Sequence, residues 1–374
     1  MYNKANNKQR SSMSGLEFLR STKIVSTVGT ATDGTSKLKS LIKAGVNVFR
    51  LNFSHGNHGD HLKRITNIRS VANEVGCNVA ILADLQGPKF RIGEVKSDIK
   101  VIKGNNYIFD KNTEIGDFSR VSLSHDEIYE SLSIGSNILM DDGKLQFVVK
   151  KISKDKINTE VVVGGYIKSN KGINLPDVVI NTNPLTPKDI EDLKFILNQD
   201  VDWIALSFVQ KLSDVEEVKK YIGDKAGIIA KIEKPSALKE LKSIIGACEG
   251  IMVARGDLGV ELPPEKVPGI QKEIILECRQ AGKPVIVATQ MLESMIDSPS
   301  PTRAEASDVA TAVFDGADAV MLSAETAVGL FPTEAVTIMD RIICSAEKHI
   351  KNHSGDGPQN LKVENLIYNA VSHS

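Results

Sequence analysis

The sequence has few cysteines and no closely spaced pair of them. Its 374 residues include 4 cysteines, at positions Cys77, Cys248, Cys278 and Cys344, and none of them forms a CxxC spacing. Single, scattered cysteines are typical of free thiols in a reducing compartment and argue against a disulfide framework or a zinc site. This absence predicts a cytoplasmic protein.

The sequence also lacks an excess of either charge and any long apolar run. Lys+Arg 46 against Asp+Glu 47 gives a formal net charge of -1, so no footprint of nucleic-acid or acidic-membrane binding is present. No apolar run approaches the roughly 18 to 20 residues that span a bilayer. Residues 1–14 lack the apolar core of a signal peptide and are expected to form a disordered tail. We expect neither a nucleic-acid nor a membrane partner.

Short apolar runs alternate with longer amphipathic stretches along most of the chain. Eight such runs occur, at 23–28, 46–51, 79–83, 202–206, 227–230, 250–253, 284–288 and 319–322. Helical periodicity lies between most of them, at 35–44, 58–75, 187–198, 213–222, 236–245 and 268–281. This βα repetition predicts a parallel sheet with helical crossovers, and the count of eight favours a closed (β/α)8 TIM barrel.

One stretch, from about Gly87 to Pro184, interrupts the alternation. It contains short β runs separated by Gly, Asp and Asn turns, with little helical periodicity. We therefore expect a small β-barrel domain inserted after the third strand, placed to act as a lid over a site at that end of the barrel. The expected domains are a tail at 1–14, the barrel at 15–86 and 185–352, the inserted domain at 87–184 and a C-terminal segment at 353–374.

Polar and charged residues follow nearly every predicted strand. Since the carboxyl ends of the strands surround the active site of a (β/α)8 barrel, these residues are expected at one rim. Among them, Lys231, Glu233 and Asp257 suit magnesium-assisted phosphoryl transfer. Two carboxylates can hold a hard divalent cation while an ammonium offsets charge on the transferred group. A plain Lys-Glu ion pair on a strand is the alternative explanation.

Several longer motifs resemble those of the pyruvate kinase family and occur in that family's order. They are TKIVSTVGTATDG, AGVNVFRLNFSHG, DLQGPKFRIG, KGINLP, IIAKIEKPSAL, VARGDLGVELP, VATQMLESM, PTRAEASDVA and DGADAVMLSAETAVGLFP. The resemblance implies an A-domain barrel, an inserted B domain and a C domain. It also implies phosphoryl transfer from phosphoenolpyruvate to ADP, giving ATP and, after protonation of the enolate, pyruvate, with Mg2+ or Mn2+ as cofactor.

The resemblance assigns roles to individual residues. Glu233 and Asp257 match the ligands of the divalent metal, and Lys231 matches the lysine that stabilises the transferring phosphoryl group and the enolate oxygen. Arg50 matches an arginine that contacts phosphate, since a guanidinium fork suits several phosphate oxygens at once. The roles of Lys231, Glu233 and Asp257 agree with what the residues alone indicate, whereas Arg50 is assigned by the resemblance.

Further matching positions concern the substrate, the proton and the nucleotide. The substrate carboxylate and the metal are received at a Gly-rich turn by the backbone amides of Ala254, Arg255, Gly256 and Asp257. The protonation of the methylene carbon involves the positions of Thr289, Ser323 and Glu325. The phosphates of the nucleotide are lined or supported by the positions of Asn52, His55, Arg91 and Lys188.

One departure concerns the monovalent cation that many members of the family require. In those members potassium is held by oxygens at the positions of Asn52, Ser54, Asp84 and the carbonyl of Leu85. This chain has Lys89 where they carry Glu. An ammonium there supplies the charge that potassium otherwise brings, and two such charges would repel. We therefore predict a potassium-independent enzyme, with a surface lysine of no such role as the alternative.

The chain ends within a segment that resembles the first helix of the family's C domain, at 364–373. We therefore expect that domain to be essentially missing and tetramers to be weakened, with homo-oligomers still formed through barrel contacts. Two other functions stay open. One is a different barrel enzyme acting on phosphoenolpyruvate or a related oxoacid, which would not need the insertion. The other is an inactive truncated pyruvate kinase fragment.

Overall fold

The computed structural model describes residues 20–176, 178–180 and 182–353. The expected tail at 1–14 and the expected C-domain helix at 364–373 lie outside these residues. Within them, no helix is both long enough and apolar enough to cross a membrane.

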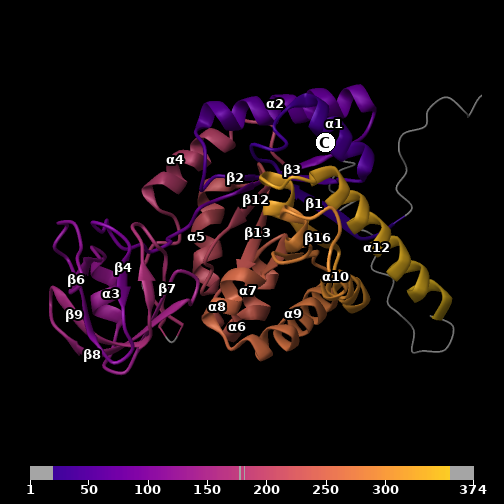
Figure 1. Ribbon diagram of the computed structural model, residues 1–374. Helices are drawn as coiled ribbons and strands as arrows, with labels where there is room; N and C mark the ends of the chain where they lie inside the picture. The colour runs from indigo at the N-terminus through magenta and orange to yellow at the C-terminus, as the bar shows by residue number, and fades with distance from the viewer. Residues whose placement is uncertain (1–19, 177, 181, 354–374) are drawn as a thin grey trace, which may run out of the picture. The chain divides into compact units, whose positions relative to one another are not determined.

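Eight strands form a closed barrel in the order β1, β16, β15, β14, β13, β12, β3, β2. Their bounds are β1 (Lys23–Thr27), β2 (Val48–Asn52), β3 (Ala80–Asp84), β12 (Trp203–Leu206), β13 (Gly227–Ile232), β14 (Gly250–Ala254), β15 (Val285–Ala288) and β16 (Ala319–Leu322). The pairs β1 with β2 and β13 with β14 are parallel. The predicted (β/α)8 barrel is confirmed, and Figure 1 labels most of its strands.

The barrel strands are mostly apolar on both faces. One face packs into the barrel interior and helices cover the other. Every residue of β3, β14, β15 and β16 is buried. Continuous apolar runs of this kind are typical of parallel strands whose outer face is covered by helices. Strand β13 extends to Ile232, two residues beyond its predicted end, so Lys231 lies inside the strand.

Helices follow the strands in alternation. They are α1 (Thr35–Ala44), α2 (His58–Val75), α4 (Pro187–Ile196), α5 (Leu212–Ile222), α6 (Pro235–Lys239), α7 (Leu241–Ala247), α8 (Arg255–Glu261), η1 (Pro264–Lys266), α9 (Val267–Ala281), η2 (Glu293–Ile296), α10 (Arg303–Asp315), α11 (Ala324–Ala327) and α12 (Pro332–His353). The single helix predicted at 236–245 is wrong, since Glu240 (φ -116, ψ 20) separates α6 from α7. Its carboxylate accepts the amide of Leu212 at 2.8 Å, which fixes this break.

Local signals explain where the longer helices begin and end. Asn57 and Asp60 form a capping box at the start of α2, which ends at Gly76 in the left-handed region (φ 71). Thr302 and Glu305 form the equivalent box at the start of α10. Such caps satisfy the amides that a first turn leaves without partners, so they define the helix starts.

The segment between β3 and α4 is almost entirely β structure. Its strands are β4 (Ile99–Val101), β5 (Asn106–Asp110), β6 (Arg120–Ser122), β7 (Asn137–Met140), β8 (Leu145–Ile152), β9 (Lys156–Val163), β10 (Gly165–Ile167) and β11 (Ile173–Asn174). They form a six-stranded sheet, β11-β7-β8-β9-β5-β6, and a two-stranded sheet, β10-β4. We call this segment the insertion; it also contains one short helix, α3 (Asp126–Ser131), which lies among these strands in Figure 1.

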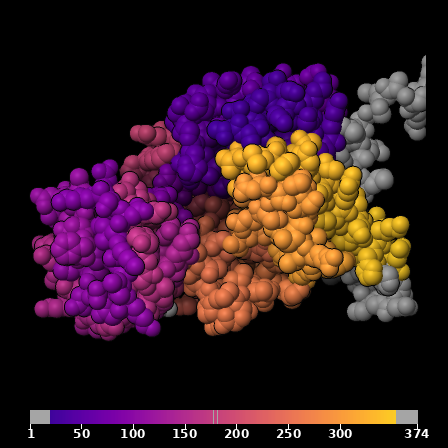
Figure 2. Space-filling model, in the orientation of Figure 1, coloured from indigo at the N-terminus to yellow at the C-terminus, as the bar shows by residue number. Residues whose placement is uncertain are grey.

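The insertion has an apolar core of its own. Tyr107, Phe109 and Phe147 are fully buried there, with their ring centroids 5.2 to 5.9 Å apart. Ile128 of α3 packs into the same core. In the space-filling view the violet to magenta atoms of the insertion form a compact body (Figure 2). A separate core is what a lid that moves as one piece requires.

The chain divides into two compact units. One comprises the described residues up to Asp84, Phe195–Ile204 and those from Gly282, and the other comprises Leu85–Lys194 and Ala205–Ala281. The second unit therefore holds the insertion together with β13, β14 and α8.

Candidate active site

In the second unit, Lys231 connects two neighbouring polar groups. Its Nζ lies 3.0 Å from Oε1 of Glu233 and donates to Oγ of Ser207 at 2.7 Å. All three residues are buried, with exposed fractions of 9%, 1% and 2% for Lys231, Glu233 and Ser207. The lysine ammonium is therefore held in one position in a dry environment, where its charge acts strongly on any group nearby.

The carboxyl group of Glu233 has a pKa above its ordinary value. Burial raises the pKa of its carboxyl to about 7; the ammonium of Lys231 opposes this change and the charge of Asp257 adds to it. Its Oε2 accepts the backbone amide of Phe208 at 2.7 Å. A buried carboxyl whose pKa is raised by a neighbouring carboxylate marks a place where a cation is stabilised.

Asp257 lies in the first turn of α8 and faces a second lysine. Nζ of Lys89 is 3.3 Å from Oδ1 of Asp257 and 5.9 Å from the centroid of the Phe208 ring. The side chains of Lys89 and Asp257 are 24% and 29% exposed, so this pair is partly open to solvent. Lys89 therefore contacts Asp257, a candidate metal ligand. The position of Lys89 in the sequence does not predict this contact.

The backbone of Ala254, Arg255 and Gly256 does not form the predicted turn. A Gly-rich turn was expected before the helix, but β14 ends at Ala254 and α8 begins at Arg255, so Gly256 is already helical. The Arg255 side chain is buried, and its Nη1 donates to Oε1 of Gln271 at 3.5 Å.

The donor set fits a divalent cation of the magnesium kind. Mg2+ is commonly bound by one or two carboxylates and completes its octahedron with water and substrate oxygens. The electrostatically coupled pair of Glu233 and Asp257 matches that pattern. Across the described ranges, no group of three or more His, Cys, Asp or Glu side chains could hold a metal by itself, so a zinc-type cage is not formed there.

In the first unit, Arg50 of β2 is anchored by a buried carboxylate. Its Nε lies 2.6 Å from Oδ2 of Asp84, and its Nη1 donates to Oγ1 of Thr27 at 3.1 Å. The side chains of Arg50 and Asp84 are 12% and 1% exposed. The guanidinium is therefore fixed from one side, which leaves the arginine oriented for anion binding.

Glu325 and Ser323 meet at the end of β16. Oε2 of Glu325 accepts the amide of Ser323 at 2.7 Å, and its Oε1 accepts the amide of Leu292 at 3.2 Å. Burial raises the pKa of the Glu325 carboxyl, and these amide contacts oppose the change. A carboxyl whose proton affinity is raised is suited to hold and pass on a proton.

Thr289 adopts a backbone conformation that a β-branched residue rarely takes. Its φ is 70 and that of Gln290 is 55. In the second unit Phe208, two residues after the end of β12, has φ 57. Oγ1 of Thr289 donates to the carbonyl of Ala288 at 2.6 Å. Left-handed backbone outside glycine is costly and concentrates at functional sites, so these strand ends are marked by strain.

The residues expected near the nucleotide and the potassium ion have hydrogen-bond or ion-pair partners within their own unit. Oδ1 of Asn52 accepts the amide of Ser54 at 3.1 Å, and the amide of His55 donates to the carbonyl of Asn52 at 3.2 Å. In the second unit, Arg91 donates to the carbonyl of Asn170 at 2.9 Å, and Lys188 lies 2.6 Å from Asp192. The carbonyl of Leu85 accepts the hydroxyl of Ser207 at 2.7 Å.

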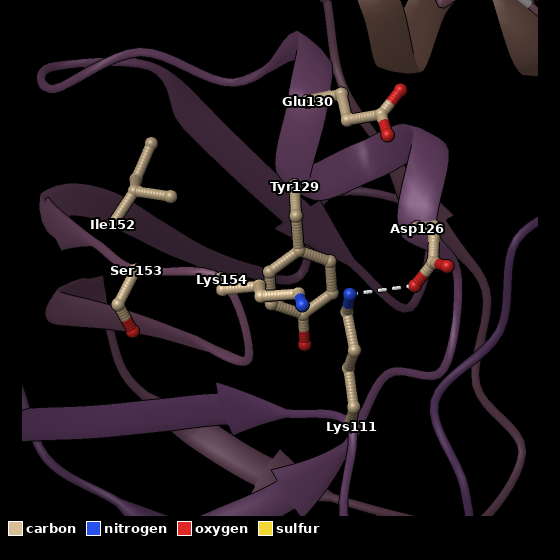
Figure 3. Close-up of a pocket in the computed structure, with 7 residues that line it drawn as sticks. All are labelled: Lys111, Asp126, Tyr129, Glu130, Ile152, Ser153 and Lys154. Carbon is tan, nitrogen blue, oxygen red and sulfur yellow. Dashed lines mark ion pairs between the residues drawn. The ribbon is translucent and has the colours of Figure 1, made fainter.

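A cavity of about 420 Å³ lies in the insertion, separate from these residues. Figure 3 shows its lining residues, Lys111, Asp126, Tyr129, Glu130, Ile152, Ser153 and Lys154. Nζ of Lys111 pairs with Asp126 at 2.6 Å and lies over the Tyr129 ring, 4.8 Å from its centroid. The pocket contains both signs of charge and none of the residues assigned to phosphoryl transfer.

Two groups without a predicted role hold Lys231 and Glu233 in place. Ser207 and the amide of Phe208 are the partners of Lys231 and Glu233. Ser207 is a polar residue directly after a predicted strand, so the sequence places it at the rim with the other strand-end residues but does not predict its bond to Lys231. The Phe208 amide has no sequence signal because any residue carries an amide.

The fold and these side chains define a (β/α)8-barrel protein with an inserted β segment. Comparison with known families gives a match of residues 19–336 to the pyruvate kinase barrel domain. A pyruvate kinase of Agrobacterium vitis is 53% identical over 337 residues, which cover 89% of this chain and 71% of that protein. Pyruvate kinase 2 of Synechocystis is 46% identical over 94% of this chain and 61% of its own length.

A solved structure agrees with the sequence relatives. The crystal structure of a pyruvate kinase from Cryptosporidium parvum matches with a TM-score of 0.86 and 39% identity, covering 91% of this chain and 74% of that one. The chain belongs to the pyruvate kinase family, a family of kinases.

Proposed function

We propose that this protein transfers the phosphoryl group of phosphoenolpyruvate to ADP with the help of Mg2+ or Mn2+, giving ATP and pyruvate. The observation that carries the proposal is the buried ammonium of Lys231, held by Glu233 at 3.0 Å and by Ser207 at 2.7 Å. The membership of this chain in the pyruvate kinase family supports the same reaction. A structural ion pair alone would not account for a neighbouring carboxylate, Asp257, whose charge adds to the raised pKa of Glu233.

The reaction breaks the bond between phosphorus and the enol oxygen and forms a bond between phosphorus and a terminal oxygen of ADP. Glu233 and Asp257 would hold the divalent cation, which supplies charge neutralisation of the phosphate oxygens when bound. Lys231 stabilises charge on the transferring group and the enolate oxygen, and Arg50 binds phosphate oxygens. The amides of residues 254–257 receive the substrate carboxylate.

The enolate then gains a proton at its methylene carbon to give pyruvate. Thr289 is proposed to lie beside that carbon, with Ser323 and Glu325 as partners that deliver the proton. The raised pKa of the buried Glu325 carboxyl supports this role, because such a group retains a proton more readily than an exposed glutamate. For the nucleotide, we propose contacts from Asn52, His55, Arg91 and Lys188.

We propose that the enzyme does not require potassium. Lys89 places an ammonium 3.3 Å from Asp257, so a fixed positive charge is present beside the candidate metal carboxylate. Two oxygens expected to bind potassium in other members have partners in this chain. Asp84 is paired with Arg50 at 2.6 Å, and the carbonyl of Leu85 accepts Ser207 at 2.7 Å.

The insertion is proposed to act as a lid that excludes water from the phosphates. Its own apolar core supports movement as one body, and exclusion of water strengthens every electrostatic interaction in a site.

Substitution of Lys231 tests the assignment directly. Lys231→Met is expected to lower the rate of pyruvate formation from phosphoenolpyruvate and ADP by about 100-fold or more, since it removes the fixed charge. Lys239→Met is the matched control, because Lys239 is an exposed lysine on α6. Equal rates for wild type and Lys231→Met, with both proteins folded, would contradict the proposal.

A further inference from the structure

A second buried lysine lies directly after the first site and has its own counter-charge. Nζ of Lys234 is 3.0 Å from Oε1 of Glu261, and the two side chains are 10% and 1% exposed. The same oxygen accepts Nδ2 of Asn174 at 2.9 Å. Glu261 is therefore the centre of a buried network that joins β11 of the insertion to α8 and to the segment after β13.

Both charged members of this network are neighbours of the candidate metal carboxylates. Lys234 follows Glu233 in the chain, and Glu261 stands four residues after Asp257 on α8. Residues four apart lie on the same face of a helix. The network therefore lies alongside the pair of carboxylates without containing either of them.

The segment of the insertion that reaches Glu261 also reaches Lys89. A Cβ atom at Gly172 would lie 3.2 Å from Cε of Lys89, so the glycine packs closely against the lysine that pairs with Asp257. Residues 172 to 174 thus contact one charged partner of Asp257 and the counter-charge of Lys234. Two adjacent contacts to the same region indicate that this segment is fitted to the site.

The charge of Glu261 has a definite electrostatic task. Without it, the ammonium of Lys234, one residue after Glu233 in the chain, would be buried and uncompensated, and a fixed positive charge in this region would repel a divalent cation. Oε2 of Glu261 has no hydrogen-bond partner among the described residues, although it is buried. A buried carboxylate oxygen kept in this state is costly, so a functional reason for retaining Glu rather than a neutral residue is expected.

We propose that Glu261 is a positioning residue: it neutralises the buried Lys234 ammonium, so that this charge does not oppose a cation bound by Glu233 and Asp257, and it connects α8 to the insertion through Asn174. This inference rests on the proposed function of Glu233 and Asp257 as metal ligands.

The test measures Mn2+ binding to the full chain by electron paramagnetic resonance, with phosphoenolpyruvate present and without turnover. Glu261→Gln is expected to weaken Mn2+ binding by about ten-fold or more, because it leaves the lysine charge uncompensated. Glu265→Gln is the matched control, since it removes the same charge from an exposed position nearby, and less than about two-fold change is expected.

A double variant separates charge pairing from packing. Lys234→Met with Glu261→Gln removes both charges and is expected to restore Mn2+ affinity to within about three-fold of wild type. Weak binding in the double variant would overturn the proposal. If Glu261→Gln does not fold, Mn2+ affinity is measured for the single variant Lys234→Met. An affinity equal to or higher than that of wild type supports the proposal, and a lower affinity contradicts it.

The wild-type titration distinguishes the two levels of inference. Absence of Mn2+ binding by folded wild-type protein contradicts the proposed function itself. Wild-type binding with an unchanged constant in Glu261→Gln contradicts only the role given to Glu261.

Discussion

Lys231 illustrates how a single residue obtains its function from its partners. Glu233 supplies a counter-charge at 3.0 Å, whereas Ser207 supplies a neutral acceptor at 2.7 Å. The glutamate keeps the lysine charged in a buried site, and the serine fixes its direction. Removing the two partners should therefore have different consequences.

Ser207→Ala is expected to lower kcat by about ten-fold while KM for phosphoenolpyruvate changes little. A hydrogen bond to a charged group contributes about 1.5–3 kcal/mol, and here it orients a group whose contribution is greatest in the transition state. Steady-state kinetics measure the effect, with the exposed Ser213→Ala as control. A rise in KM with unchanged kcat would indicate a ground-state role instead.

Lys89→Glu is expected to create a requirement for potassium. The substitution replaces the ammonium 3.3 Å from Asp257 by a carboxylate, so the local positive charge must come from solution. Turnover of the variant should rise by about ten-fold or more on adding potassium to a tetramethylammonium buffer. The exposed Lys96→Glu serves as control. Lys89→Glu without a potassium response would show that Lys89 does not replace the ion.

The residue types of the site could be predicted, but some of their partners could not. Lys231, Glu233 and Asp257 stand out because charged residues directly after apolar runs are uncommon in buried elements. Ser207 and the Phe208 amide follow β12, the strand that neighbours β13 in the barrel. Which groups meet across two strands depends on barrel order and register, and neither is visible in the local sequence.

At the scale of elements, the start of α10 depends on one carboxylate. Partial burial raises the pKa of Glu305, but hydrogen bonds from Ser294 and Thr302 outweigh it, so the pKa lies below its ordinary value. The bonds from the Ser294 amide, the Ser294 hydroxyl and the Thr302 amide are 2.7, 2.6 and 2.7 Å long. The ionised carboxylate therefore stabilises this helix start.

Glu305→Gln is expected to reduce the free energy of unfolding by about 0.5–1 kcal/mol at pH 7. A depressed folded-state pKa contributes stability above the unfolded pKa of about 4.3, and this contribution is lost as pH falls through the lower folded value. The difference between variant and wild type should therefore shrink below about pH 4. Urea unfolding at several pH values measures it, with exposed Glu216→Gln as control. A difference that does not change with pH would contradict the charge-based account.

Most barrel elements could be predicted because each carries its own periodicity and caps. The predicted helix at 35–44 coincides with α1 and the one at 58–75 with α2, both of which end at glycines with positive φ. The break between α6 and α7 could not be predicted, because it depends on Glu240 reaching the amide of Leu212 in another helix. Long-range contacts of this kind override local helix propensity.

At the scale of the molecule, the insertion and the barrel are more closely connected than the sequence suggests. The insertion shares one compact unit with β13, β14 and α8. Contacts such as Asn174 with Glu261 account for this. This contact joins residues 87 positions apart in the chain, so no local sequence pattern predicts it.

Replacing residues 95–168 by a short Gly-Ser linker tests the lid. This change removes most of the insertion but keeps Lys89, Arg91 and Asn174. Turnover should fall by about 100-fold or more because water is no longer excluded, whereas Mn2+ binding should persist. Unchanged turnover in a variant shown to be folded by thermal unfolding would contradict the lid.

The most direct test is the formation of pyruvate from phosphoenolpyruvate and ADP by the wild-type chain with Mg2+, in tetramethylammonium buffer with and without potassium. The account predicts ADP-dependent turnover that responds less than about two-fold to potassium, because Lys89 already supplies a positive charge beside Asp257. No turnover in either buffer from folded protein would contradict the central claim. Activation of about ten-fold by potassium would keep the reaction and contradict the role given to Lys89.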